Sequence, residues 1–117
     1  AIPLLKGTLH FPDGQPVPGA SVQILSWTCL TSHDRVAKSD IQNGLTWGDS
    51  GRDGSFVIPV NFPRSVDGIS VQFEILDIYG QTLLETEVEL SLAHSYEIGT
   101  LVVPRVDSPE GVSESAV

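Results

Sequence analysis

The stretch Leu9–Leu25, LHFPDGQPVPGASVQIL, decides the fold of this chain. Apolar and polar residues alternate at both of its ends, whereas residues 13–19 hold two glycines, two prolines and an aspartate. Alternation with a period of two is typical of a β-strand that buries one face. Asp13-Gly14 suits a tight turn because glycine adopts a positive φ without a Cβ clash. We therefore predict two strands joined by a turn, and the turn residues are explained by backbone geometry alone.

The same alternation recurs along the chain and is separated each time by turn-forming residues. No segment shows a sustained helical period. Many short strands with frequent turns indicate an all-β, antiparallel β-sandwich of about seven strands. The predicted strands cover residues 6–11, 20–25, 55–60, 69–75, 85–90 and 96–103, with a short seventh at 45–47.

Three features of these strands predict where they lie in the sheets and where one of them is irregular. Pro59 cannot donate a ladder hydrogen bond, so its strand should lie at a sheet edge or turn that position to solvent. Glu85, Glu87 and Glu89 should line one solvated face that protects an edge from aggregation. Gly99 should permit a bulge in the last strand.

A chain of 117 residues suits one domain with a single hydrophobic core. We expect this sandwich to occupy residues 1–103. Residues 104–117 are polar, carry two prolines and lack periodicity, so we expect a tail or linker there. Because the chain begins at Ala1 rather than Met, we expect a processed or excised part of a longer protein.

The formal net charge of −9 is concentrated in the second half, where residues 67–117 carry ten acidic residues and one basic residue. Such a surface repels phosphate backbones, so nucleic acid is not expected as a partner. No apolar run approaches the roughly 18 residues that a membrane-spanning helix needs, so membrane insertion is not expected either. The single cysteine, Cys29, ends an apolar run and is expected to be a small core residue.

The turn motif resembles that of the carboxypeptidase regulatory-like group, whose domains are transthyretin-like (prealbumin-like) β-sandwiches. The resemblance covers about residues 4–103 and implies a fold, because the shared residues form turns. It implies a non-catalytic module attached to a secreted or surface protein. The matching residues are Asp13, Gly14, Pro16, Gly19 and Ala20 in the first turn, and Gly54 and Phe56 in the second.

Two enzyme families share this opening but need residues that the chain lacks. The intradiol dioxygenases bind iron through two tyrosines and a closely spaced histidine pair, and His10, His33 and His94 are scattered. The hydroxyisourate hydrolases carry a Tyr-Arg-Gly-Ser ending that is absent. The segment DSGRDG at 49–54 resembles a calcium loop only in part, because Val60 stands where the loop needs a bidentate glutamate. We therefore expect no catalytic residues, no metal and no cofactor.

Residues 31–53 form a long polar connection, and long loops in compact domains are often functional. Trp47 is its aromatic residue, and tryptophan is favoured in binding hot spots and on sugar-binding surfaces. Trp27, by contrast, is expected in the core, as in many sandwiches. The predicted binding residues are Trp47, His33, Asp34, Arg35 and Arg52.

The sequence thus predicts a non-catalytic interaction or accessory module of a secreted or cell-surface protein. It would bind a protein partner, or a carbohydrate, through residues 31–53. The alternative is a structural subunit of a homomeric filament or fibre, in which a terminal segment or an edge strand pairs with the next subunit.

Overall fold

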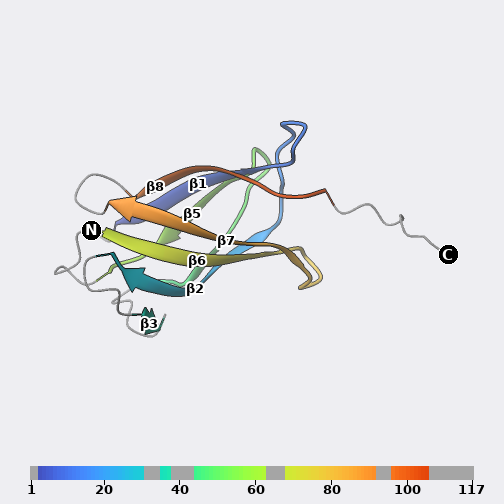
Figure 1. Ribbon diagram of the computed structural model, residues 1–117. Helices are drawn as coiled ribbons and strands as arrows, with labels where there is room; N and C mark the ends of the chain where they lie inside the picture. Colours follow the sequence, from blue (N-terminus) through green and yellow to red (C-terminus); the bar gives the residue numbers. More distant parts are fainter. Residues whose placement is uncertain (1–2, 31–34, 38–43, 63–67, 92–95, 106–117) are drawn as a thin grey trace.

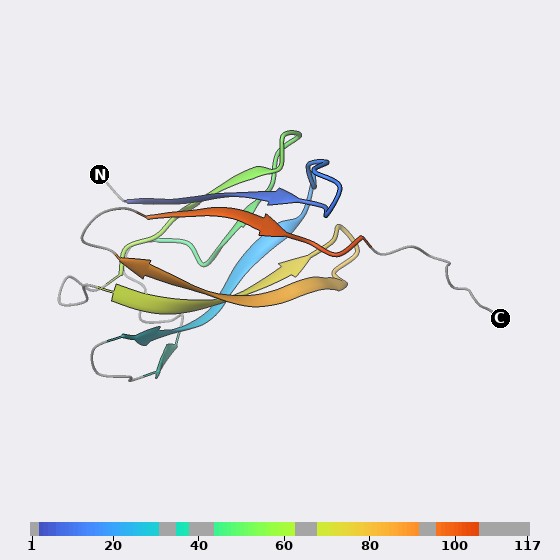
Figure 2. The same cartoon turned by 45° about the horizontal axis from the view of Figure 1, so that its top comes forward.

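Two β-sheets packed face to face form the part of the chain that the structure describes (Figure 1). The structure is a computed structural model that describes residues 3–30, 35–37, 44–62, 68–91 and 96–105, with the backbone alone for 35–37. These residues form eight strands and no helix. The predicted all-β sandwich is therefore confirmed, with β1 and β8 lying over β6 and β7 (Figure 2).

The smaller sheet has the order β5-β1-β8, with β5 (Ser55–Pro59), β1 (Leu4–His10) and β8 (Glu97–Val102). β1 pairs antiparallel with β5 and parallel with β8, so one strand pair departs from the antiparallel expectation. The register of β1 and β8 shifts at Gly99, whose φ of 76° marks the predicted bulge. Because β5 ends this sheet, Pro59 lies on an edge strand, as predicted.

The larger sheet is built on β2 (Ser21–Cys29), which pairs with β6 (Gly68–Leu76), and β6 pairs with β7 (Thr82–Ser91). Two short strands share the other side of β2: β3 (Arg35–Ala37) pairs near its end and β4 (Trp47–Asp49) near its beginning. β4 is the predicted seventh strand, displaced by two residues. β3 was not predicted because its segment is polar and short.

The core lies between the sheets and follows the predicted alternation. Every side chain that the pattern directs inward from β2, β5 and β6 is buried, and each contributes about 1.5–3 kcal/mol by burial. Trp27 is also buried, and its ring meets the edge of Phe62 at a centroid distance of 5.3 Å. Cys29 packs partly buried against the core. Glu85, Glu87 and Glu89 are exposed on β7, the last strand of its sheet, as predicted.

The turn at residues 13–19 has the predicted conformation. Gly14 and Gly19 have φ values of 89° and 69°, in the region that favours glycine. The Asp13 carboxylate accepts a hydrogen bond from the Gln15 N–H at 3.0 Å, and Phe11 N–H donates to the Gln15 carbonyl at 2.8 Å. These bonds are internal to the turn, so they support its structural interpretation.

Candidate functional site

Of the five predicted binding residues, the structure describes Trp47, Arg52 and the backbone of Arg35, and these three lie at separate places. Trp47 pairs with Gln23 at the beginning of β2, whereas the backbone of Arg35 pairs with Thr28 near its end. From Gln23 to Thr28 the strand rises by roughly 16 Å. Arg52 lies in the exposed turn after β4. His33, Asp34 and the side chain of Arg35 lie outside the described residues, so the joint role of the five stays a prediction.

Residues 44–49 join the edges of the two sheets. On one side, the Ile24 N–H donates to the Thr46 carbonyl at 2.6 Å, ahead of the β4–β2 ladder. On the other side, the Leu45 N–H donates to the Pro59 carbonyl of β5 at 2.6 Å. This segment therefore closes one flank of the sandwich.

Apolar side chains are exposed along this flank. Trp47 has 47% of its surface exposed, and Leu45 alternates with it on the same segment. On the adjoining sheet, Val57 is exposed on β5, and exposed Leu4 pairs with Pro59. We call this set, Leu4, Leu45, Trp47 and Val57, the seam patch.

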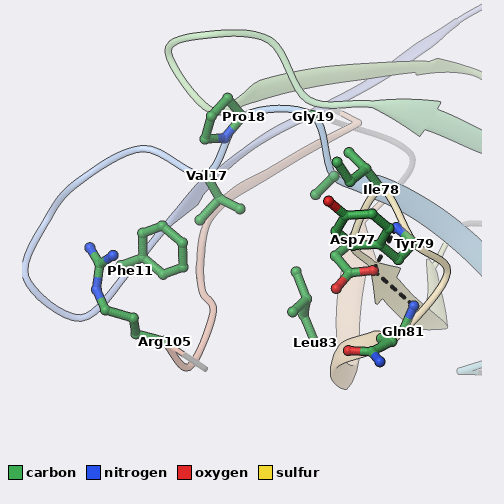
Figure 3. A pocket seen from close by; sticks show the side chains of 11 residues that line it. Phe11, Val17, Pro18, Gly19, Asp77, Ile78, Tyr79, Gln81, Leu83 and Arg105 are labelled. Atoms are coloured by element: carbon green, nitrogen blue, oxygen red, sulfur yellow. Dashed lines mark hydrogen bonds between the residues drawn. The ribbon is translucent and has the colours of Figure 1, made fainter. Parts of the chain in front are cut away.

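A groove of about 520 Å³ lies at one end of the sandwich (Figure 3). One wall comes from the connection between β1 and β2, and the other from the turn between β6 and β7. Arg105, just beyond β8, completes the rim. We call it the end groove; its lining is Phe11, Val17, Pro18, Gly19, Ala20, Asp77, Ile78, Tyr79, Gln81, Leu83 and Arg105.

Ser50 holds the first wall in place. Its buried hydroxyl accepts a hydrogen bond from the Ala20 N–H at 2.9 Å and donates one to the Val17 carbonyl at 2.6 Å. Its own N–H donates to the Ala20 carbonyl at 2.8 Å. The turn after β4 and the groove wall are thus tied together by one side chain.

The second wall is a turn whose shape depends on Asp77 and Gly80. The Asp77 Oδ1 atom accepts hydrogen bonds from the N–H groups of Tyr79 and Gln81, both at 2.9 Å. Neither bond uses the side chains of Ile78 or Tyr79, which are 74% and 82% exposed. Turn geometry does not require large apolar residues at these positions, so the turn itself does not explain them.

Arg105 lies against the first wall of the groove. Its Nη2 is 3.0 Å from the Asp13 Oδ2, and its guanidinium carbon lies 4.0 Å from the centre of the Phe11 ring. The Gln15 N–H and the Arg105 cation together lower the pKa of Asp13. The cation is therefore neutralised by a carboxylate and stacked on an aromatic face at the same time.

The titratable groups with shifted pKa values belong to turns and to the core. The hydroxyl and N–H of Ser55 lower the pKa of Asp53, in the segment predicted to be a turn rather than a calcium loop. Burial raises the pKa of Tyr96. Within the described ranges, no three His, Cys, Asp or Glu side chains are grouped to hold a metal, and no helix could cross a membrane.

The sequence pattern did not identify the end groove. Residues 78–81, IYGQ, lie between the predicted strands 69–75 and 85–90, where the pattern predicts only a turn. Phe11 and Arg105 are 94 positions apart in the sequence, so no local pattern could join them. Comparison with protein-family models, curated proteins and solved structures finds no match to this chain.

Proposed function

We propose that this chain is a non-catalytic interaction module of a secreted or cell-surface protein, of the transthyretin-like, carboxypeptidase regulatory-like kind. It binds a protein partner through the described part of residues 31–53, with Trp47 as the anchor. The observation that carries this proposal is the seam patch, in which Trp47 is half exposed and Leu4, Leu45 and Val57 are exposed on the same segment or on the adjoining strands β1 and β5. Covering such a surface is favourable, and tryptophan is over-represented among residues that dominate binding energy.

A carbohydrate is the second ligand class that this surface suits. The register of the larger sheet places Gln23 beside Trp47 and Glu74 beside Gln23. An indole face next to amide and carboxylate groups can stack on a sugar ring and hydrogen-bond to its hydroxyls. A protein partner is favoured because exposed apolar side chains, Leu45, Val57 and Leu4, lie on the same segment as Trp47 or on the strands β5 and β1 next to it.

The test compares wild type with Trp47→Ala on arrays of extracellular proteins and of glycans, followed by titration of each ligand found. We expect Trp47→Ala to weaken protein binding at least tenfold, as for a hot-spot residue, without lowering the melting temperature. Leu30→Ala is the control, because it removes an exposed large apolar side chain that belongs neither to the seam patch nor to the end groove. Ligands that bind Trp47→Ala as tightly as they bind wild type would contradict the role of Trp47.

The filament alternative has one observation in its favour. β8 is the last strand of the smaller sheet among the described residues, and Val102 is exposed on it. Light scattering over a concentration series separates the two functions, because a module stays monomeric and a subunit grows with concentration. Removal of residues 106–117 would then show whether the terminal segment joins the subunits.

A further inference from the structure

One carboxylate oxygen in the end groove has no partner among the described residues. Asp77 uses Oδ1 for both hydrogen bonds of its turn, which leaves Oδ2 unpaired. Figure 3 shows Oδ2 on the side of the carboxylate that faces the groove. Because an ionised carboxylate is an acceptor only, a ligand that reaches this oxygen must bring a donor, and a cation makes the strongest bond.

The rest of the groove is mainly apolar. Phe11 and Val17 line it on one side, and Leu83 lies between them and the opposite wall (Figure 3). Lysine and arginine side chains place an apolar stem on such a surface while the charged head reaches a polar group. The volume of about 520 Å³ also leaves room for the residues that precede and follow such a lysine or arginine in a partner protein.

Arg105 shows within this protein how the groove receives a cation. Its guanidinium stacks on Phe11 and pairs with Asp13 on the first wall. On the opposite wall, Asp77 and Tyr79 supply the same two kinds of group, a carboxylate and an exposed aromatic ring. A second basic side chain could therefore pair with the Asp77 carboxylate and stack on the Tyr79 ring, as Arg105 does with Asp13 and Phe11.

The local charge also favours a cation. Asp13 and Arg105 neutralise each other, so Asp77 is the remaining charge of the groove lining. The chain as a whole carries a net charge of −9, which attracts basic partners and repels acidic ones.

We propose that the end groove binds a lysine or arginine side chain, together with adjacent apolar residues, from an extended segment of a partner protein. This site is separate from the seam patch and does not rest on the role proposed for Trp47. Its two determinants are the Asp77 carboxylate and the apolar lining of Phe11, Val17 and Leu83.

The experiment uses the full chain labelled with ¹⁵N and three capped tripeptides, Ac-Leu-Arg-Val-NH₂ and its counterparts with Gln and Glu at the centre. Amide signals of Gly19, Tyr79 and Leu83 report on the groove, and those of Trp47 and Asp49 on the flank. The decisive variant is Asp77→Asn, because an asparagine keeps an Oδ1 acceptor for the turn but removes the charge that faces the groove.

We expect the Arg peptide to shift the groove signals saturably. The substitution Asp77→Asn should weaken the affinity for this peptide about fivefold, as for a partly exposed ion pair. Trp47→Ala should leave its affinity unchanged, and added salt should lower it. Equal binding of the Arg and Gln peptides, equal binding to Asp77→Asn, no saturable shift, or shifts confined to the flank would each overturn the proposal. If Asp77→Asn fails to fold, the comparison of the three peptides on wild type decides.

Discussion

Replacement of Gly54 by alanine should come close to unfolding the protein. Gly54 is buried with a φ of +81°, and its carbonyl accepts a hydrogen bond from the Leu9 N–H at 2.8 Å. A Cβ at this position would lie 2.3 Å from the Leu9 carbonyl oxygen, which belongs to the backbone of β1 and cannot rotate away. The substitution therefore forces β1 and the turn after β4 apart.

Three costs add at this position. The left-handed conformation costs an alanine about 1–2 kcal/mol. The displacement of packed backbone costs about 1–3 kcal/mol, and a weakened Leu9–Gly54 hydrogen bond about 1 kcal/mol. The sum of roughly 3–6 kcal/mol is a large part of the 5–15 kcal/mol by which domains are stable.

Gly80→Ala is the matched control for this substitution. Gly80 has nearly the same φ, +83°, but a Cβ there would meet nothing within 4 Å. We expect it to cost only the conformational term of about 1–2 kcal/mol. Urea denaturation of wild type and both variants measures the difference, and equal losses for the two variants would refute the steric reasoning.

Three further substitutions or conditions test other contacts. Trp27→Phe should leave the free energy of unfolding within about 1 kcal/mol of wild type or raise it, because the buried indole N–H has no partner among the described residues. Ser50→Ala should lower it by about 2 kcal/mol, since it strips two buried backbone groups of their hydrogen bonds; thermal denaturation measures both variants. Hydrogen bonds in the folded protein lower the pKa values of Asp13 and Asp53 from the ordinary value of 3.8. The ionised carboxylates therefore stabilise the fold above pH 3.8, and this contribution is lost as the pH falls through the pKa of the folded state. An acid titration of Asp13→Asn and Asp53→Asn should therefore be flatter below pH 3.8 than that of wild type, and identical curves would contradict it.

Local sequence determined the six longer strands, the turns and the inward faces, but not the short strand β3. Period-two alternation identified Phe73 and the other inward-facing residues of β6, Ile69, Val71 and Ile75, as core, because successive side chains of a strand point to opposite faces. Gly14 and Gly19 were predicted from turn chemistry, which acts over four residues. The exposed glutamates of β7 followed from the same alternation. Each of these features depends on residues that are close together in the chain.

Tertiary structure decided which strands pair and which surfaces form. The parallel pairing of β8 with β1 brings the residues after β8 back to the first turn, where Arg105 meets Asp13 and Phe11. The end groove exists only because that turn, the β6–β7 turn and Arg105 converge at one end of the sandwich. Likewise, Trp47 and Val57 come to the same flank of the sandwich only because residues 44–49 bridge the two sheets. Sequence patterns report the faces of single strands, whereas a binding surface is assembled from several strands whose contacts no local pattern records.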